Sequence, residues 1–421
     1  MVSNFLRVAA ALLSLATSAA GAAPLSLDDA LRVAEERSQL LPARSAAARG
    51  AREMAVAAGQ RPDPVLRAGV ENVPISGPDR FSLTADQMTQ RTIGVMQEWT
   101  RGDKLRARSL RFEREAELAE AQRLQALTDL QRETATAWLD RHYQERMRAL
   151  LAQQLDEARL QTQAAESAYR SARGAQADVF AARAAAAQVE DRLAATDRDV
   201  ATAKTMLARW VGAAAAAEPP GPPPPMATVR MSEDELDTAL AHHPQIAVLQ
   251  KMEQAAEADS EAARTNRYPD VSVELQYSQR GSAYANMVSF NVSLPLPWDQ
   301  KQRQEREVAA RLATVEQLRG QREEETRAHV AEARATLQQW RSATERLRRY
   351  ERELLPLASD RTNAALAAYR GGTAPLAAVL DARRAEIDTR MEQLRIEMEA
   401  ARRWAQLNYL VPVHGAGEAR P

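Results

Sequence analysis

The chain has 421 residues, of which 27% are charged and only 5% are aromatic, and its formal net charge at pH 7 is -1. Abundant Ala, Arg, Gln and Glu favour long helices over a compact mixed domain, and the balanced charge gives no electrostatic reason to expect a nucleic acid as partner. Cysteine is absent, which excludes disulfides, thiolate metal sites, cysteine nucleophiles and an N-terminal lipid attached to cysteine.

Residues 1–22 have the pattern of a secretory signal peptide. Arg7 precedes an apolar run over residues 8–15, and small residues follow up to Ala22. This run is shorter than the roughly 20 apolar residues that a membrane-spanning helix needs. The sequence therefore predicts an exported chain that is cleaved after Ala22, and no later segment has the pattern of a spanning helix.

The first half of the mature chain, residues 23–211, is predicted to alternate long helices with two short strands. Ser26 or Asp28 is the expected cap of its first helix. The expected elements in chain order are a helix over 26–60, strands over 64–72 and 92–99, a helix over 103–171, a turn over 172–175 and a helix over 176–211. A linker rich in Ala and Pro, residues 212–231, ends this half.

The second half, residues 232–411, repeats the first. The segment RPDPVLRAGV resembles YPDVSVELQY at an offset of 207 residues, TIGVMQEWTRGDK resembles VSFNVSLPLPWDQK at 197, and AYRSARGAQADVFAAR resembles AYRGGTAPLAAVLDAR at 200. Such offsets are too long for the repeats of a solenoid and indicate a tandem duplication. Residues 412–421 are expected to be a flexible tail.

Helix lengths predict an elongated molecule. The long helices, 103–171 and 301–370, each have about 70 residues and would each span roughly 105 Å. Two short helices laid end to end match one long helix in length. The sequence therefore predicts a rod, with the strands at one end and the helix turns at the other. The linker would lie near the middle of the rod. The helices alone fit a plain antiparallel coiled coil equally well.

The stretch 269–301 has the alternation of a two-stranded hairpin. Its apolar positions are expected to face lipid, and its polar positions are expected to line water. These polar positions are Ser272, Glu274, Gln276, Ser289, Asn291 and Ser293. The matching hairpin, 64–99, alternates less regularly and carries Arg67. Trp99 and Trp298 follow the strands, where they would form an interfacial aromatic girdle or pack in a hinge.

Four strands are too few to close a membrane barrel. Open strand edges leave backbone groups unsatisfied in lipid, at several kcal/mol each, so closure would require further copies of the chain. Two, three or four copies related by rotation would supply eight, twelve or sixteen strands. The strands are close to the roughly 9 to 11 residues that cross a bilayer at a tilt.

The duplicated order of elements, the segments VMQEWTRGDKLRAR and VSLPLPWDQKQRQ after the strands, and the turn AYRGGTAPLAAVLDAR together resemble the TolC-like outer-membrane efflux protein family. The resemblance covers nearly all of the mature chain. It implies a mainly α fold with a small membrane β-barrel part: a homotrimer whose twelve-stranded barrel lies in the bacterial outer membrane and continues into a periplasmic helical barrel. It also implies two partners, a periplasmic adaptor and an inner-membrane pump of the resistance-nodulation-division type.

The resemblance further implies that the helix turns form the periplasmic gate and contact the adaptor. The residues expected there are Tyr169, Gly174, Asp178 and Val179 of the first turn and Tyr369, Gly371, Gly372, Pro375, Val379, Leu380 and Asp381 of the second. Gly174 is matched to Gly371 or Gly372. In the alternative interpretation, the Gly and Pro residues only reverse the chain, and Asp178 only interacts with a helix dipole.

No enzymatic motif or cofactor-binding motif is evident. The histidines His142, His242, His243, His329 and His414 do not have the spacing of a zinc site. The segment MTQRTIGVMQEW resembles the branch of the family that exports heavy-metal cations, and Met88, Met96 and Met287 could be soft ligands or simply apolar. Export of drugs or small solutes is the alternative function. An exported coiled-coil scaffold is a second alternative, whereas an adaptor would not duplicate the whole chain.

Overall fold

The computed structural model describes residues 24–230 and 243–412. The expected signal peptide, residues 413–421 of the expected tail, and His242 and His414 lie outside the described residues. The chain divides into two compact units. We call residues 24–38, 128–230 and 332–412 the helical unit and residues 39–127 and 243–331 the sheet unit.

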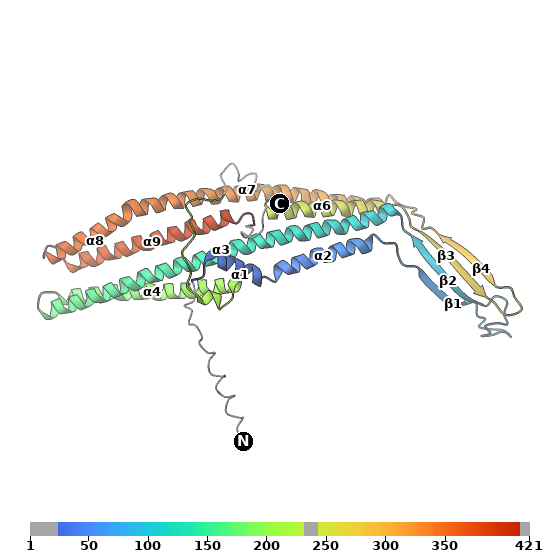
Figure 1. Cartoon of the computed structure of the whole chain (residues 1–421), viewed down its shortest axis with the longest axis horizontal. Coiled ribbons are helices and arrows are strands. Elements are labelled where there is room, and N and C mark those ends of the chain that lie inside the picture. The colour runs from blue at the N-terminus through green and yellow to red at the C-terminus, as the bar shows by residue number, and fades with distance from the viewer. Residues whose placement is uncertain (1–23, 231–242, 413–421) are drawn as a thin grey trace, which may run out of the picture. The chain divides into compact units, whose positions relative to one another are not determined.

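The sheet unit holds one antiparallel sheet of four strands in the order β1-β2-β3-β4, which run on from the ends of helices (Figure 1). Its elements are α2 (Leu40–Ala58), β1 (Val65–Glu71), β2 (Gln90–Trp99), the start of α3 (Gly102–Arg170), α6 (Pro244–Thr265), β3 (Val271–Gln279), β4 (Met287–Ser293) and the start of α7 (Gln304–Arg349). Pairing of β2 with β3 joins the hairpins of the two halves into a single sheet.

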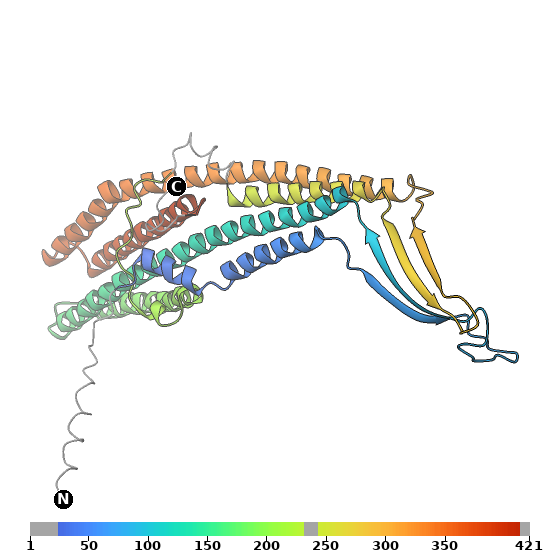
Figure 2. The same ribbon diagram turned by 45° about the vertical axis from the view of Figure 1, so that its right-hand side comes forward.

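The helical unit contains the remainders of α3 and α7 together with the shorter helices, as Figures 1 and 2 show. Its other elements are α1 (Leu27–Arg37), α4 (Gln176–Val211), the 3-10 turn η1 (Ala215–Ala217), the π-helical turn η2 (Tyr350–Leu354), α8 (Leu355–Arg370) and α9 (Leu376–Asn408). This order confirms the duplicated arrangement of helices and strands that the sequence predicts. None of the helices in the described parts of the chain is long and apolar enough to cross a membrane.

Local sequence explains where several helices begin. The Ser26 hydroxyl accepts a hydrogen bond from the Asp29 N–H at 3.0 Å, so Ser26, and not Asp28, caps α1. In α6 the His243 side chain takes the same role toward Gln245, and Pro244 occupies the first helical position, where a missing N–H costs nothing.

Two of the predicted helices are interrupted in the structure. The expected helix over 26–60 is divided at Ser38, which has an extended backbone, into α1 and α2. The expected helix over 301–370 begins at Gln304 and widens into η2. Pro356 is the second residue of α8, one residue beyond the end of η2; because proline lacks an N–H and its ring collides with the carbonyl four residues earlier, it disrupts the regular α-helical hydrogen bonds of the preceding turn.

In the helical unit, α3, α4 and α9 share an apolar core. Met147, Leu151 and Leu155 of α3 pack with Val189 of α4 and with three residues of α9. The α9 residues are Ile387, Met391 and Leu394. Burial of such side chains contributes about 1.5 to 3 kcal/mol each, which holds the two helical hairpins together along this core.

Leu25 and the linker that follows α4 are both fixed to α3. The indole N–H of Trp138 donates to the Leu25 carbonyl at 2.9 Å, and the fully buried Arg141 donates to the Glu218 carbonyl. Leu25 also forms a parallel bridge with Pro220. Side chains of α3 thereby hold part of the linker rich in Ala and Pro.

Candidate functional site

The turns after α3 and α8 have the same hydrogen bonds, two hundred residues apart. In the second turn, the Gly372 N–H donates to the Tyr369 carbonyl at 3.0 Å, and the Thr373 N–H donates to the Ala368 carbonyl at 2.9 Å. The equivalent bonds of the first turn are Ala172 to Tyr169 at 3.0 Å and Arg173 to Ala168 at 2.9 Å. The structure thus fixes the register of the two turns, with Tyr169 equivalent to Tyr369.

This register changes the glycine pairing that the sequence predicts. The left-handed position is held by Gly372, with φ 73°, and by Ala172, with φ 55°. Gly174 is therefore equivalent to Ala374 and not to Gly371 or Gly372. Gly174 serves a different purpose, because a Cβ there would lie 3.1 Å from the Ala168 Cβ; it allows the chain to pass close to the end of α3.

Asp178 caps the start of α4. Its carboxylate accepts a hydrogen bond from the Ala175 N–H at 3.2 Å. At the equivalent position of the second turn Pro375 has no N–H to satisfy, and Ala378 replaces the aspartate. The contact of Asp178 in the structure is therefore the helix-start contact of the alternative interpretation.

The other candidate residues of the turns fall into a buried and an exposed group. Val179 and Val379 lie in a small apolar core with Leu376, and Tyr369 and Leu380 pack against it. The exposed candidates are Tyr169, Gly371, Gly372, Pro375 and Asp381. Phe180, which is 58% exposed beside Val179, was missed by the sequence analysis, although the offset of 200 residues pairs it with Leu380. Exposed aromatic and charged side chains beside a rigid core are suited to contact another protein.

A groove runs along α3, α4 and α9 next to these turns, with a cavity volume of about 220 Å³. Three alanines of α4 line it, and Leu380, Asp381 and Arg383 of α9 line it on the side of the second turn. The groove brings two of the predicted residues, Leu380 and Asp381, next to charged residues that the sequence analysis did not single out.

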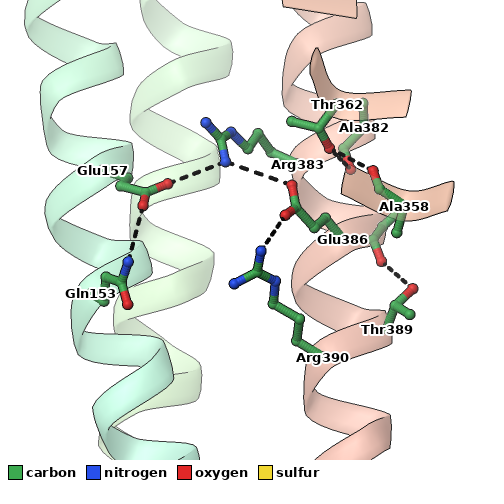
Figure 3. Close-up of polar contacts among 10 residues, drawn as sticks. Gln153, Glu157, Ala358, Thr362, Ala382, Arg383, Glu386, Thr389 and Arg390 are labelled. Atoms are coloured by element: carbon green, nitrogen blue, oxygen red, sulfur yellow. Dashed lines mark hydrogen bonds and ion pairs between the residues drawn. The ribbon is translucent and has the colours of Figure 1, made fainter. Parts of the chain in front are cut away.

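Those charged residues form a ladder of ion pairs (Figure 3). Arg383 lies 3.3 Å from the Glu157 carboxylate and 3.6 Å from that of Glu386, and Arg390 lies 2.7 Å from Glu386. Glu386 is only 5% exposed, and the two arginines are its ion-pair partners. Thr362 of α8, also buried, donates to the Ala358 carbonyl of its own helix and to the Ala382 carbonyl of α9. The ladder and this hydrogen bond join α3 to α9 and α8 to α9.

In the sheet, the six polar positions that the sequence predicts to line water share one face. Strand register pairs Ser272 with Ser293, Glu274 with Asn291, and Gln276 with Ser289. The opposite face carries apolar rows, such as Leu66, Val95, Leu275 and Phe290.

The sheet has its apolar face outermost. Leu275 and Phe290 are 57% and 67% exposed, whereas the side chain of Glu274 is 16% exposed and Ser278 is 1% exposed. This difference holds for β3, whereas Arg67, Asn291 and Ser293 of the same polar face are exposed. This burial is the reverse of that in a soluble protein, where an exposed apolar patch of this kind marks a contact surface.

Arg67, the irregular residue of the first hairpin, lies on the polar face. Its guanidinium is 3.4 Å from the Glu274 carboxylate. Gly94 of β2 stands between Arg67 and Gln276 in the register, and a Cβ at Gly94 would lie 3.1 Å from the Leu275 carbonyl oxygen. The missing side chain lets Arg67 reach across β2. Glu71 on the same face accepts a hydrogen bond from Gln276 at 3.3 Å.

Both tryptophans after the strands are exposed. Trp99 is 47% exposed and Trp298 is 90% exposed, so neither side chain is buried in a hinge. At the same junction Lys104 and Asp270 form a buried ion pair of 2.7 Å, and the Arg101 guanidinium lies over the Tyr268 ring. The ion pair fixes the start of α3 to the start of β3.

Two of the three candidate methionines, Met96 and Met287, and the described histidines of this set contact other side chains, whereas Met88 is 56% exposed. The sulfur of Met96 accepts from Arg67 and that of Met287 from Arg280. The ring of His243 packs 4.1 Å from that of His329, and His142 stacks on Trp138. Within residues 24–230 and 243–412, no group of three or more His, Cys, Asp or Glu residues could hold a metal ion.

Comparison with known proteins gives one family and a set of similar structures. Residues 236–411 match the family model described as outer membrane efflux protein. No curated protein sequence matches the chain. The structure is similar to that of the outer membrane protein VceC from Vibrio cholerae, with a TM-score of 0.76, 20% identity, and coverage of 91% of this chain and 95% of that one.

Two further structures are similar over nearly the same extent. CusC has a TM-score of 0.74 at 16% identity and covers 92% of each chain. The open state of the MtrE outer membrane channel of Neisseria gonorrhoeae has a TM-score of 0.71 at 16% identity, over 91% of this chain and 88% of that one. At these identities the likeness establishes a shared fold.

Proposed function

We propose that the chain belongs to the outer membrane efflux protein family, whose model residues 236–411 match, and that it is the outer-membrane exit duct of a tripartite efflux system. In this function it conducts solutes passively from a pump and adaptor complex to the exterior and carries out no chemical reaction. The observation that carries the proposal is the sheet with one polar face and one exposed apolar face.

An exposed apolar face suits lipid, and a polar face on the other side of the same strands suits a water-filled lumen. The outer strands of the sheet, β1 and β4, each pair with one neighbour in the described residues. Their remaining edges need partners in a bilayer, because an unsatisfied backbone group there costs several kcal/mol. A homotrimer with a twelve-stranded barrel would supply these partners. In it the exposed Trp99 and Trp298 would lie at the membrane surface.

The helix turns are the proposed contact with the periplasmic adaptor and the proposed gate. Tyr169, Phe180 and Asp381 are exposed there beside the buried Val179 and Val379. The adaptor would in turn join the channel to an inner-membrane pump of the resistance-nodulation-division type. Cysteines introduced at Asp178 and Ala378 and crosslinked between neighbouring protomers should stop transport, and full transport despite complete crosslinking would overturn the gate assignment.

Heavy-metal cations are the proposed substrates, on the resemblance of the MTQRTIGVMQEW segment to the metal-exporting branch of the family. Drug or small-solute export is the second candidate. A deletion strain separates the two: sensitivity to copper, zinc or cobalt salts with unchanged drug tolerance supports metal export, whereas the opposite pattern supports drug export.

Membrane fractionation tests the duct itself. The protein should be recovered from the outer-membrane fraction as trimers that dissociate only on heating, and these trimers should conduct ions in planar bilayers. Recovery as a soluble periplasmic protein would instead support the coiled-coil scaffold. The exposed apolar rows of the sheet, with Val288 and Phe290 at 69% and 67%, count against a scaffold in water.

A further inference from the structure

We infer that the linker after α4 presents a polyproline II ridge, formed by Pro219, Pro222 and Pro225, that binds a partner protein through a groove lined with aromatic side chains. The inference goes beyond the proposed function and does not depend on it. The ridge belongs to the helical unit, and its contact with another protein requires no transport.

The sequence of the linker enforces the polyproline II conformation. Six of the seven residues from 219 to 225 are proline, and Gly221 is the exception. Proline fixes φ at about -65°, and a residue that precedes proline is restricted to extended or polyproline II backbone. Glu218, which precedes Pro219, has φ -68° and ψ 144°, close to the polyproline II values of about -75° and +145°. The chain therefore enters residues 219–225 in this conformation.

Exposure of the side chains along this segment has a period of three. Pro219, Pro222 and Pro225 are exposed, whereas the four residues between them are buried or partly buried. A polyproline II helix has three residues per turn, so side chains three residues apart lie on the same side of it. At about 3.1 Å per residue, the row from Pro219 to Pro225 is about 19 Å long.

The opposite side of the segment is held against Leu25. The Leu25 N–H donates to the Pro219 carbonyl, and the Gly221 N–H donates to the Leu25 carbonyl, both at 2.9 Å. Gly221 is buried, and a Cβ there would lie 3.4 Å from the Leu25 carbonyl oxygen. These contacts determine which side of the segment faces the solvent.

Two contacts with α9 hold the far end of the linker. The indole N–H of Trp404 donates to the Thr228 carbonyl at 3.0 Å, and the Arg230 N–H donates to the side-chain oxygen of Asn408 at 3.0 Å. The ridge is thus fixed at both ends. A segment that is already held in its bound conformation loses little conformational entropy when it binds, so the ridge is pre-organised for a partner.

The chemistry of the ridge indicates the kind of partner. Residues 219–229 carry no charged side chain, so the ridge offers apolar rings and backbone carbonyls. Protein grooves lined with aromatic side chains bind such segments and take up prolines that are spaced three residues apart. Pro219, Pro222 and Pro225 supply this spacing twice. Because no charge of the ridge takes part, its binding should depend little on salt concentration.

Binding of a WW domain that recognises runs of proline tests the ridge itself. The purified full-length protein in detergent should bind this probe equally well at low and high salt. The double variant Pro222→Ala and Pro225→Ala should weaken binding about ten-fold or more, because it empties two pockets of the groove. The matched control, Pro223→Ala and Pro224→Ala, removes the same number of prolines from the covered side and should have a much smaller effect. No binding by the wild-type protein, or an equal loss in both double variants, overturns the inference.

Photocrosslinking in intact cells tests the native partner. A photoreactive residue introduced at position 219, 222 or 225 should give an adduct with another protein, whereas one introduced at position 223 or 224 should not. The captured protein, once purified, should bind the wild-type chain and the control variant but not the variant of the exposed row.

Three results of the crosslinking contradict the inference. Adducts only between copies of this chain or with peptidoglycan, and adducts without a period of three, each exclude the predicted partner. Absence of any adduct would show that the linker is a rigid spacer only. Neither experiment measures transport, so a failure here leaves the proposed exit duct standing.

Discussion

Pro356 of α8 occupies the position that Asp156 holds in α3, two hundred residues earlier in the chain. Just before Pro356 the helix is π-helical over Tyr350–Leu354, with the Leu355 N–H bonded to the Tyr350 carbonyl, whereas α3 is α-helical throughout Gly102–Arg170. One substitution between the repeats thus accounts for an interrupted helix in the second half and a continuous one in the first.

Replacing Pro356 should remove the local weakness of this helix. In the native chain, amides of residues 350–354 should exchange with deuterium faster than those of residues 150–154, because the wide turn has poorer hydrogen bonds. Pro356→Ala should slow the exchange of residues 350–354. The reciprocal variant Asp156→Pro should destabilise α3 by about 3 kcal/mol, with Asp156→Ala as its control. Equal exchange of the two segments in the native chain would contradict the prediction.

Replacing Ala with Gly in the first turn and Gly with Ala in the second turn should change the free energy of unfolding in opposite directions. Ala172 has a positive φ that costs an L-residue about 1 to 2 kcal/mol, so Ala172→Gly should raise the free energy of unfolding by about 1 kcal/mol. Gly372→Ala should lower it by a similar amount. Gly371, with φ -77°, is the control and should tolerate Ala. Thermal unfolding followed by circular dichroism measures all three variants, and loss of stability in Ala172→Gly would refute the assignment.

Position 281 is predicted to require glycine, because the loop between β3 and β4 meets the loop between β1 and β2 there. A Cβ at Gly281 would lie 1.9 Å from the Thr84 carbonyl oxygen, and Arg280 beside it donates to the Gln87 carbonyl at 2.9 Å. Gly281→Ala should therefore separate the loops and expose residues 72–89 to proteases. Gly50→Ala, where nothing lies within 4 Å of the added Cβ, is the control. Unchanged proteolysis of the Gly281→Ala protein would show that the loops are not in contact.

His142 should make stability depend on pH. Burial, and secondarily the charge of Arg146, lowers the pKa of His142 below its usual value of 6.5. The unfolded chain then binds the proton more readily than the folded one, so stability is full above the unfolded pKa and falls as the pH drops through the folded pKa.

A comparison of unfolding at pH 7.5 and pH 5.5 measures this effect. His142→Phe retains a ring for stacking on Trp138 but cannot be protonated, so it should reduce the loss of stability on acidification. His329→Phe, at a partly buried position in the sheet unit, shows how much of the change belongs to histidines in general. An equal loss in the native chain and in His142→Phe would exclude His142 as the group responsible.

The sequence predicts strongly periodic helices and strands well, but it predicts poorly which side chains contact one another. Alternation in 269–301 identifies both strands and the face that carries Glu274, because a period of two leaves little freedom of register. The repeat of the turn sequences places Tyr169 and Tyr369 at equivalent positions. The predicted match of Gly174 to Gly371 or Gly372 is wrong because it follows residue type. In the structure, the residue with positive φ that corresponds to Gly372 is Ala172.

Contacts between distant segments have no local signal. Nothing near Arg383 in sequence indicates its partner Glu157, and the capping role of Asp178 depends on the extended backbone of Ala175. Pro356 is visible in the sequence, but the sequence analysis predicts an uninterrupted helix there, because the length of that helix matches the length of α3. A proline inside a helix of otherwise consistent pattern is thus the local signal that should outweigh length.

The ion pair between Arg67 and Glu274 joins positions that correspond under the duplication, since 207 residues separate them and 207 is the offset of their two segments. Two identical halves in the same sheet would bring like charges together at this point, and like charges on neighbouring strands are destabilising. The pair is therefore available only to a fused chain whose halves have diverged. A single gene holding both repeats can evolve complementary charges at the seam between them, which an assembly of six separate identical halves could not do.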